Sequence, residues 1–267
     1  MDYRRTYRSA AVSFVDLVSR VPADRLDGPG LGKWTLRDLI GHTVSSALEQ
    51  VPAVLGTASA RGRTSSASTS SGETSDGSPP PPGSGAPAGE PSFLPGSAAS
   101  SGRSTSLPGA ASSPGSPSTF RPAPPTVNVE APEGYFAFVR DVPPELYAAA
   151  VAASDDDARR AADLLTSAGD LAGRATQALA AVADDDVVST PVGGMRVRDW
   201  LPTRTFELVV HGSDVAAAAG VPVAFDPAAV SEATLLAARI AVALGEGPAV
   251  LSALTGRTPL PENFSVV

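Results

Sequence analysis

Two histidines and one glutamate are the residues of this chain best suited to bind a metal ion. The chain has 267 residues but only two histidines, His42 and His211, and each lies in a run with helical spacing. Glu207 precedes His211 by four residues, so both side chains point the same way on a helix. With His42 from a neighbouring helix they form a two-histidine, one-carboxylate set. Such a set leaves coordination positions for water or substrate, which is typical of a catalytic metal site.

Each of these residues also has an ordinary structural interpretation. A Glu-x-x-x-His pair is common on exposed helices, and His42 could be a hydrogen-bonded residue of the core. Histidine is scarce here, and both copies lie beside apolar positions of amphipathic runs. This economy adds support to a shared metal site, and the structural alternatives stay open at this point.

Two charged residues at helical spacing could support this set. Arg204 lies three residues before Glu207, so it could hydrogen-bond that carboxylate or hold an anionic group of a substrate. A catalytic role for Arg204 is therefore a hypothesis, and an ordinary ion pair on the helix is the alternative. Asp214 lies three residues after His211 and could accept a hydrogen bond from its second ring nitrogen.

The elements that must position these residues are expected to be helices. Few aromatic residues (5%) and much alanine favour closely packed helices over a β core. Thr35 and Asp38 form a capping-box pattern, Gly220 is a C-cap, and Gly-Gly at 193–194 predicts a hairpin or extended loop over 187–197. The apolar spacing predicts helices over 3–21, 36–55, 132–139, 144–153, 155–183, 199–219, 227–244 and 248–254.

Residues 56–125 differ sharply in composition from the rest of the chain. Ser, Gly, Pro, Ala and Thr dominate this stretch, so it cannot bury enough apolar surface to offset its ordering entropy. We expect a disordered insertion, and a partner-binding tether is the functional alternative. Residues 1–55 and 126–267 would then form one discontinuous metal-binding helical bundle.

Composition excludes several classes of function. Without cysteine the chain has no disulfide, thiolate ligand or cysteine nucleophile, so any thiol chemistry needs a small-molecule thiol. A net charge of -8 without basic stretches argues against a nucleic-acid partner. No segment has the length and apolarity of a membrane span, and the N-terminus lacks an apolar signal core. We therefore expect a cytoplasmic protein that contacts neither nucleic acid nor membrane.

Three segments resemble the mycothiol-dependent maleylpyruvate isomerase family: the run from Leu31 to Thr43, the run from Trp200 to Gly212, and the tail Leu254–Val266. The resemblance implies an all-α, DinB-like four-helix bundle, here with a small hairpin, extra C-terminal helices and the long insertion. In that family one histidine of the second helix and a Glu-x-x-x-His pair of the last bundle helix hold a divalent metal, usually zinc. These roles would fall on His42, Glu207 and His211.

The sequence thus predicts a metal-dependent enzyme that uses a low-molecular-weight thiol, with thiol transfer or isomerisation on a small electrophile. Coordination to a divalent metal deprotonates a thiol, whose free pKa is near ~8.5. Mycothiol as the thiol is implied by the resemblance alone. A hydrolase with metal-activated water needs the same open site and stays an alternative, as does a non-catalytic metal-binding or interaction module.

Overall fold

Helices make up most of the described chain. The computed structural model describes residues 2–56, 58, 126–138 and 142–267. Nearly all of the predicted 56–125 insertion lies outside these residues. The helices and strands are α1 (Tyr3–Ser19), η1 (Ala23–Arg25), α2 (Leu36–Val44), η2 (Ser45–Glu49), α4 (Pro132–Ala137), α5 (Pro144–Ala161), η4 (Ala162–Ser167), α6 (Ala168–Ala180), β1 (Val187–Thr190), β2 (Gly193–Arg196), α7 (Val197–Ala219), α8 (Pro227–Ala243) and α9 (Gly247–Leu254).

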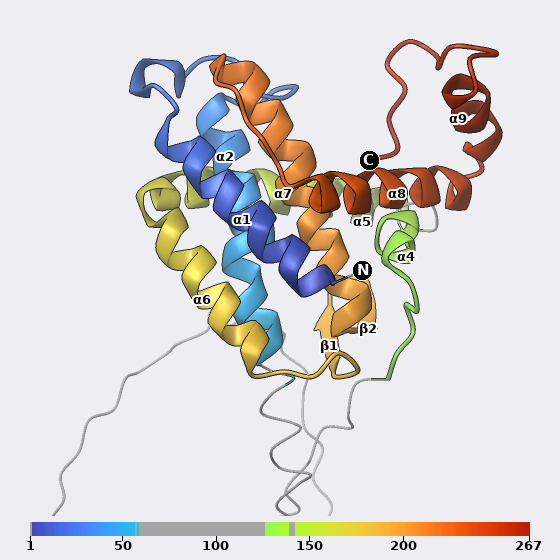
Figure 1. The fold of residues 1–267 in the computed structure, drawn as a ribbon, viewed down its shortest axis with the longest axis horizontal. Coiled ribbons are helices and arrows are strands. Elements are labelled where there is room, and N and C mark those ends of the chain that lie inside the picture. Colours follow the sequence, from blue (N-terminus) through green and yellow to red (C-terminus); the bar gives the residue numbers. More distant parts are fainter. Residues whose placement is uncertain (1, 57, 59–125, 139–141) are drawn as a thin grey trace, which may run out of the picture. The chain divides into compact units, whose positions relative to one another are not determined.

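Four of these helices form a bundle (Figure 1). Helix α1 packs on α7 and α6, α2 packs on α7, and η2 continues α2 against α6 and α7. Large side chains such as Tyr7, Phe14 and Trp200 fill the interior between them and are fully buried. C-terminal to the bundle, α8 packs on α7 and α9 packs on α8. The all-α prediction is therefore confirmed, and the arrangement is compatible with a DinB-like bundle.

The ends of the two site-bearing helices follow local sequence signals. Thr35 Oγ1 accepts from the Asp38 backbone N–H, and the Asp38 carboxylate accepts from the Thr35 N–H, which completes the predicted capping box of α2. Gly220 adopts the left-handed conformation after α7 with φ 66°, where an L side chain would be strained. Both helices therefore begin or end close to the predicted residues.

One predicted helix boundary is wrong. Separate helices were predicted over 144–153 and 155–183, but α5 continues through this boundary to Ala161. Asp156 and Asp157 instead make ion pairs with arginines three residues on, which supports a continuous helix. The break comes later, where the predicted 155–183 helix tightens into the 3₁₀ segment η4 before α6.

The predicted hairpin is present, but its turn lies elsewhere. Strands β1 and β2 pair antiparallel from Val187↔Arg196 to Thr190↔Gly193, so Pro191 and Val192 form the turn. The glycines predicted to turn the chain lie in β2. The carbonyl of Gly194 accepts a hydrogen bond from the Asn128 N–H of a neighbouring segment. That segment lies so close that a side chain at Gly194 would overlap Thr126.

Glycines beside both histidines allow close helix packing. A Cβ at Gly41 would overlap the carbonyl oxygen of Ala158 in α5, and a Cβ at Gly212 would lie 2.6 Å from the ring of Phe225. Since α2 packs closely on α5, Gly41 sets how near α5 comes to the neighbouring His42.

None of the helices in the described ranges combines the length and apolar character that crossing a bilayer requires. The expected cytoplasmic location stays a prediction.

We predict that Gly41→Ala lowers the free energy of unfolding by about 1–3 kcal/mol, because the new methyl group forces α5 away from α2. Gly173→Ala is the matched control, since a Cβ there meets nothing within 4 Å on an exposed part of α6. The control should be neutral or gain about 0.5–1 kcal/mol from helix propensity. Chemical denaturation measures both; equal stabilities for the two variants would contradict this packing argument.

Candidate metal centre

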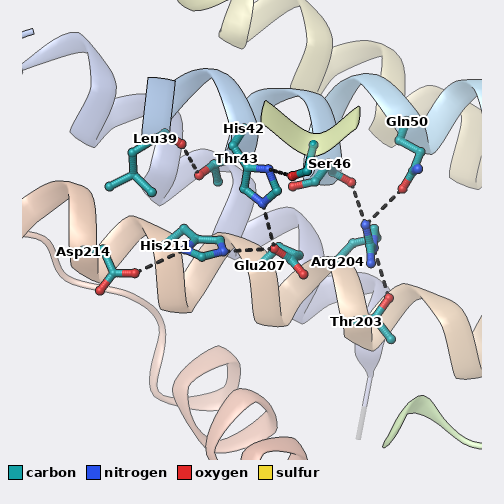
Figure 2. Close-up of polar contacts among 11 residues, drawn as sticks. Leu39, His42, Thr43, Ser46, Gln50, Thr203, Arg204, Glu207, His211 and Asp214 are labelled. Carbon is teal, nitrogen blue, oxygen red and sulfur yellow. Dashed lines mark hydrogen bonds and ion pairs between the residues drawn. The ribbon is translucent and has the colours of Figure 1, made fainter. Parts of the chain in front are cut away.

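Three potential metal ligands converge between α2 and α7 (Figure 2). His42 projects from α2, and Glu207 and His211 lie one turn apart on α7. Glu207 Oε2 lies 3.7 Å from His42 Nε2 and 3.3 Å from His211 Nε2. One donor atom from each residue lies within 4.8 Å of the other two. The structure thus brings together the three residues that the sequence singled out.

The site is sheltered but reachable from solvent. The side chains of His42, Glu207 and His211 are 18%, 13% and 16% exposed. The two imidazoles meet edge to face, with ring centroids 5.1 Å apart. A small ligand could therefore approach the three donors while most of their surface stays away from water.

The second nitrogen of each imidazole is already occupied. His211 Nδ1 lies 3.2 Å from Asp214 Oδ2, the contact expected from their spacing, and His42 Nδ1 lies 3.2 Å from Ser154 Oγ. Both Nε2 atoms are left facing Glu207. Metal-binding histidines commonly donate one ring N–H to a carboxylate or other oxygen, which fixes the ring and directs the other nitrogen to the ion.

Charge strongly couples these side chains. Burial by itself would raise the pKa of the Glu207 carboxyl, but hydrogen bonds from His211 and His42 and the charge of Arg204 hold that pKa well below its usual value. Burial would lower the pKa of His211, yet hydrogen bonds to Asp214 and Glu207 raise it to about 9. In the metal-free protein Glu207 is therefore ionised, and His211 is protonated at neutral pH.

An aromatic ring forms one side of the site. The ring centroids of Trp34 and His42 are 4.7 Å apart. Asp155 fixes the indole, because Trp34 Nε1 donates to Asp155 Oδ1 at 2.8 Å and Lys33 Nζ donates to the other carboxylate oxygen. Ser154 and Asp155 are neighbours on α5, so this one turn orients both His42 and Trp34. No local pattern points to these two residues, which lie more than a hundred positions from their partners.

Arg204 makes different contacts from those expected. Arg204 is 2% exposed, and its guanidinium donates to Ser46 O at 2.9 Å, Gln50 Oε1 at 3.0 Å and Thr203 Oγ1 at 3.0 Å. No hydrogen bond or ion pair within 4.0 Å links it to Glu207 among the described residues, although its charge still acts on that carboxyl. The catalytic role suggested for Arg204 stays a prediction.

A cavity of about 560 Å³ is lined in part by Asp214. Its walls come from α7, α8, α9 and the tail, and they include Phe206, Val210, Asp214, Ala237, Leu254 and Phe264. The carboxylate that orients His211 therefore lines this cavity as well.

The donor set fits a divalent metal such as zinc. Two imidazole nitrogens and one carboxylate oxygen are the ligands of several catalytic zinc sites, in which a water or substrate occupies the remaining position. Both Nε2 atoms already face the carboxylate, and the three donor atoms lie within 4.8 Å of one another, so they could hold a single ion.

One comparison with known proteins found a match. Residues 118–216 match the family model described as the mycothiol maleylpyruvate isomerase N-terminal domain. Glu207 and His211 lie inside the matched stretch, and His42 lies outside it. No curated protein and no solved structure matches the chain. Residues 118–216 are thus similar to the N-terminal domain of that family, in agreement with the resemblance seen in the sequence.

Proposed function

We propose that this protein is a metal-dependent enzyme that uses a low-molecular-weight thiol, mycothiol, to attack a small electrophile. The observation that carries the proposal is the convergence of two imidazole nitrogens and one carboxylate oxygen within 4.8 Å. The family match supports the choice of thiol.

The ion would be held by His42, Glu207 and His211, and we propose that it is zinc. A bound divalent metal supplies Lewis acidity that makes a thiol ionise at neutral pH. Asp214 and Ser154 keep the two Nε2 atoms directed at the site. Three protein ligands leave room for one further donor.

The chain's own residues favour an external thiol. It contains no cysteine, so no internal sulfur can compete for the ion. The cosubstrate would lose its proton to solvent, and its sulfur would form a bond to an electrophilic carbon. Release of a leaving group then gives transfer, whereas return of the thiol after bond rotation gives isomerisation. Trp34 beside His42 reduces the access of water on that side of the site.

We predict that the purified protein binds zinc in near-stoichiometric amount and that Glu207→Ala weakens binding at least about 100-fold. Removal of a residue that merely orients a metal ligand costs about 10–100-fold, so loss of a ligand should cost at least as much. Asp16→Ala is the control, because Asp16 pairs with Arg20 on the exposed surface of α1. Competition with a chromogenic chelator measures the affinities. Equal, negligible zinc in wild type and Glu207→Ala would refute the metal site.

An activity assay tests whether the reaction depends on a thiol. A chromogenic electrophile such as 1-chloro-2,4-dinitrobenzene should react with mycothiol faster in the presence of the zinc protein, and Glu207→Ala should abolish the acceleration. An activity that persists without any thiol would instead assign the site to hydrolysis by water.

Zinc binding should strengthen with pH, because the ion requires neutral imidazole and His211 is protonated below about 9. For each proton that zinc displaces, the zinc affinity rises tenfold per pH unit. With the one proton of His211 we expect the affinity to increase about 100-fold between pH 6 and pH 8. Calorimetry in two buffers of different ionisation enthalpy counts the protons. An affinity independent of pH over this range would show that His211 does not give up a proton to the metal.

A further inference from the structure

The helix that carries His42 changes its hydrogen-bond register just after the histidine. Ser45 to Glu49 form the π-helical segment η2 between α2 and the residues that follow. In an α-helix the Gln50 N–H would donate to Ser46 O, but here it donates to Ser45 O. One such turn inserts an extra residue and shifts the face of everything beyond it.

Arg204 donates a hydrogen bond to Ser46 O, the carbonyl that the Gln50 N–H would bond in an α-helix. Its Nη1 donates both to Ser46 O at 2.9 Å and to Gln50 Oε1 at 3.0 Å. A single nitrogen of α7 therefore links the inside of the π-helical segment to the first residue after it. Its Nε is held in turn by Thr203 Oγ1 at 3.0 Å, which anchors the guanidinium to its own helix.

The same two helices meet at the metal centre one turn away. Figure 2 shows His42, Ser46 and Gln50 along one helix facing residues of α7. Arg204 and Glu207 lie three residues apart on α7. The hydrogen bond from Arg204 to Ser46 and the contact of Glu207 with His42 are therefore neighbouring contacts across the same helix–helix interface. A change in the register of η2 would alter how His42 is presented to Glu207.

We propose that Arg204 is a positioning residue that holds the π-helical register of Ser45–Glu49 and thereby directs His42 to the other two metal ligands. This inference rests on the proposed metal site. It assigns Arg204 no contact with substrate.

The surroundings of Arg204 suit this role. The guanidinium carbon lies 4.8 Å from the centre of the Tyr135 ring and 5.7 Å from that of Trp200, so aromatic groups confine it. At 2% exposure it cannot turn to solvent. The planar guanidinium can satisfy a carbonyl, an amide and a hydroxyl at once, which a lysine ammonium on a flexible stem reproduces only in part.

The first test uses the metal-free protein. Hydrogen exchange should be at least about tenfold faster for the amides of 45–50 in Arg204→Met than in wild type, because the segment is free to change register. Arg204→Lys should give an intermediate rate. Arg4→Met is the matched control: Arg4 likewise joins two helices, through Leu179 O and Val182 O, but does so at the end of α6.

The second test adds metal. Zinc should bind Arg204→Met about 10–100-fold more weakly than wild type, the cost typical of a lost orienting partner, and the visible spectrum of the cobalt-substituted protein should change. Arg204→Lys should recover part of the affinity, and Arg4→Met should keep all of it. If Arg204→Met fails to fold, Gln50→Leu removes one acceptor of the same nitrogen and should show smaller changes in both measurements.

These outcomes separate the two proposals. Zinc binding that is absent from wild type would refute the metal site, while the exchange experiment would still test the hold on η2. Wild-type zinc binding together with unchanged exchange or unchanged zinc affinity in the Arg204 variants would overturn the positioning role.

Discussion

A carboxylate held between two imidazoles inside a helix–helix interface is the constraint on which this structure depends. Glu207 is ionised in a largely dry position, and such a charge persists only where it is fully compensated. His42 and His211 approach its oxygen from α2 and α7, and Arg204 adds a further positive charge nearby. The cluster therefore fixes the relative register of α2 and α7. The packing of these two helices in turn holds the charged side chains in place.

Much of this arrangement was predictable from the sequence, because its signals are local. The spacing of Glu207 and His211 needs only a helix, and the capping box at Thr35 marks where the helix of His42 begins. The partner of His211, Asp214, follows from the same spacing rule. The meeting of the two helices was inferred from the scarcity of histidine and the family resemblance rather than from any local rule.

The rest was not predictable, since it arises from contacts between distant residues. Ser154 and Asp155 meet the site only because Gly41 lets α5 lie directly on α2. The π-helical segment η2 has no sequence signature that distinguishes it from the α-helix expected over 36–55. In α5, where two helices were predicted, ion pairs between aspartates and the arginines three residues on support one continuous helix.

Charge balance explains why a thiolate suits the proposed site. In the metal-free protein the negative charge of Glu207 is shared between protonated His211 and Arg204. In the proposed complex that carboxylate would serve the divalent ion, and His211 would give up its proton. Arg204, buried and without an ion pair of its own among the described residues, would add to the excess of positive charge. An anionic sulfur reduces that excess where a neutral ligand does not, so the fixed arginine would favour the ionised form of the cosubstrate as well as the position of His42.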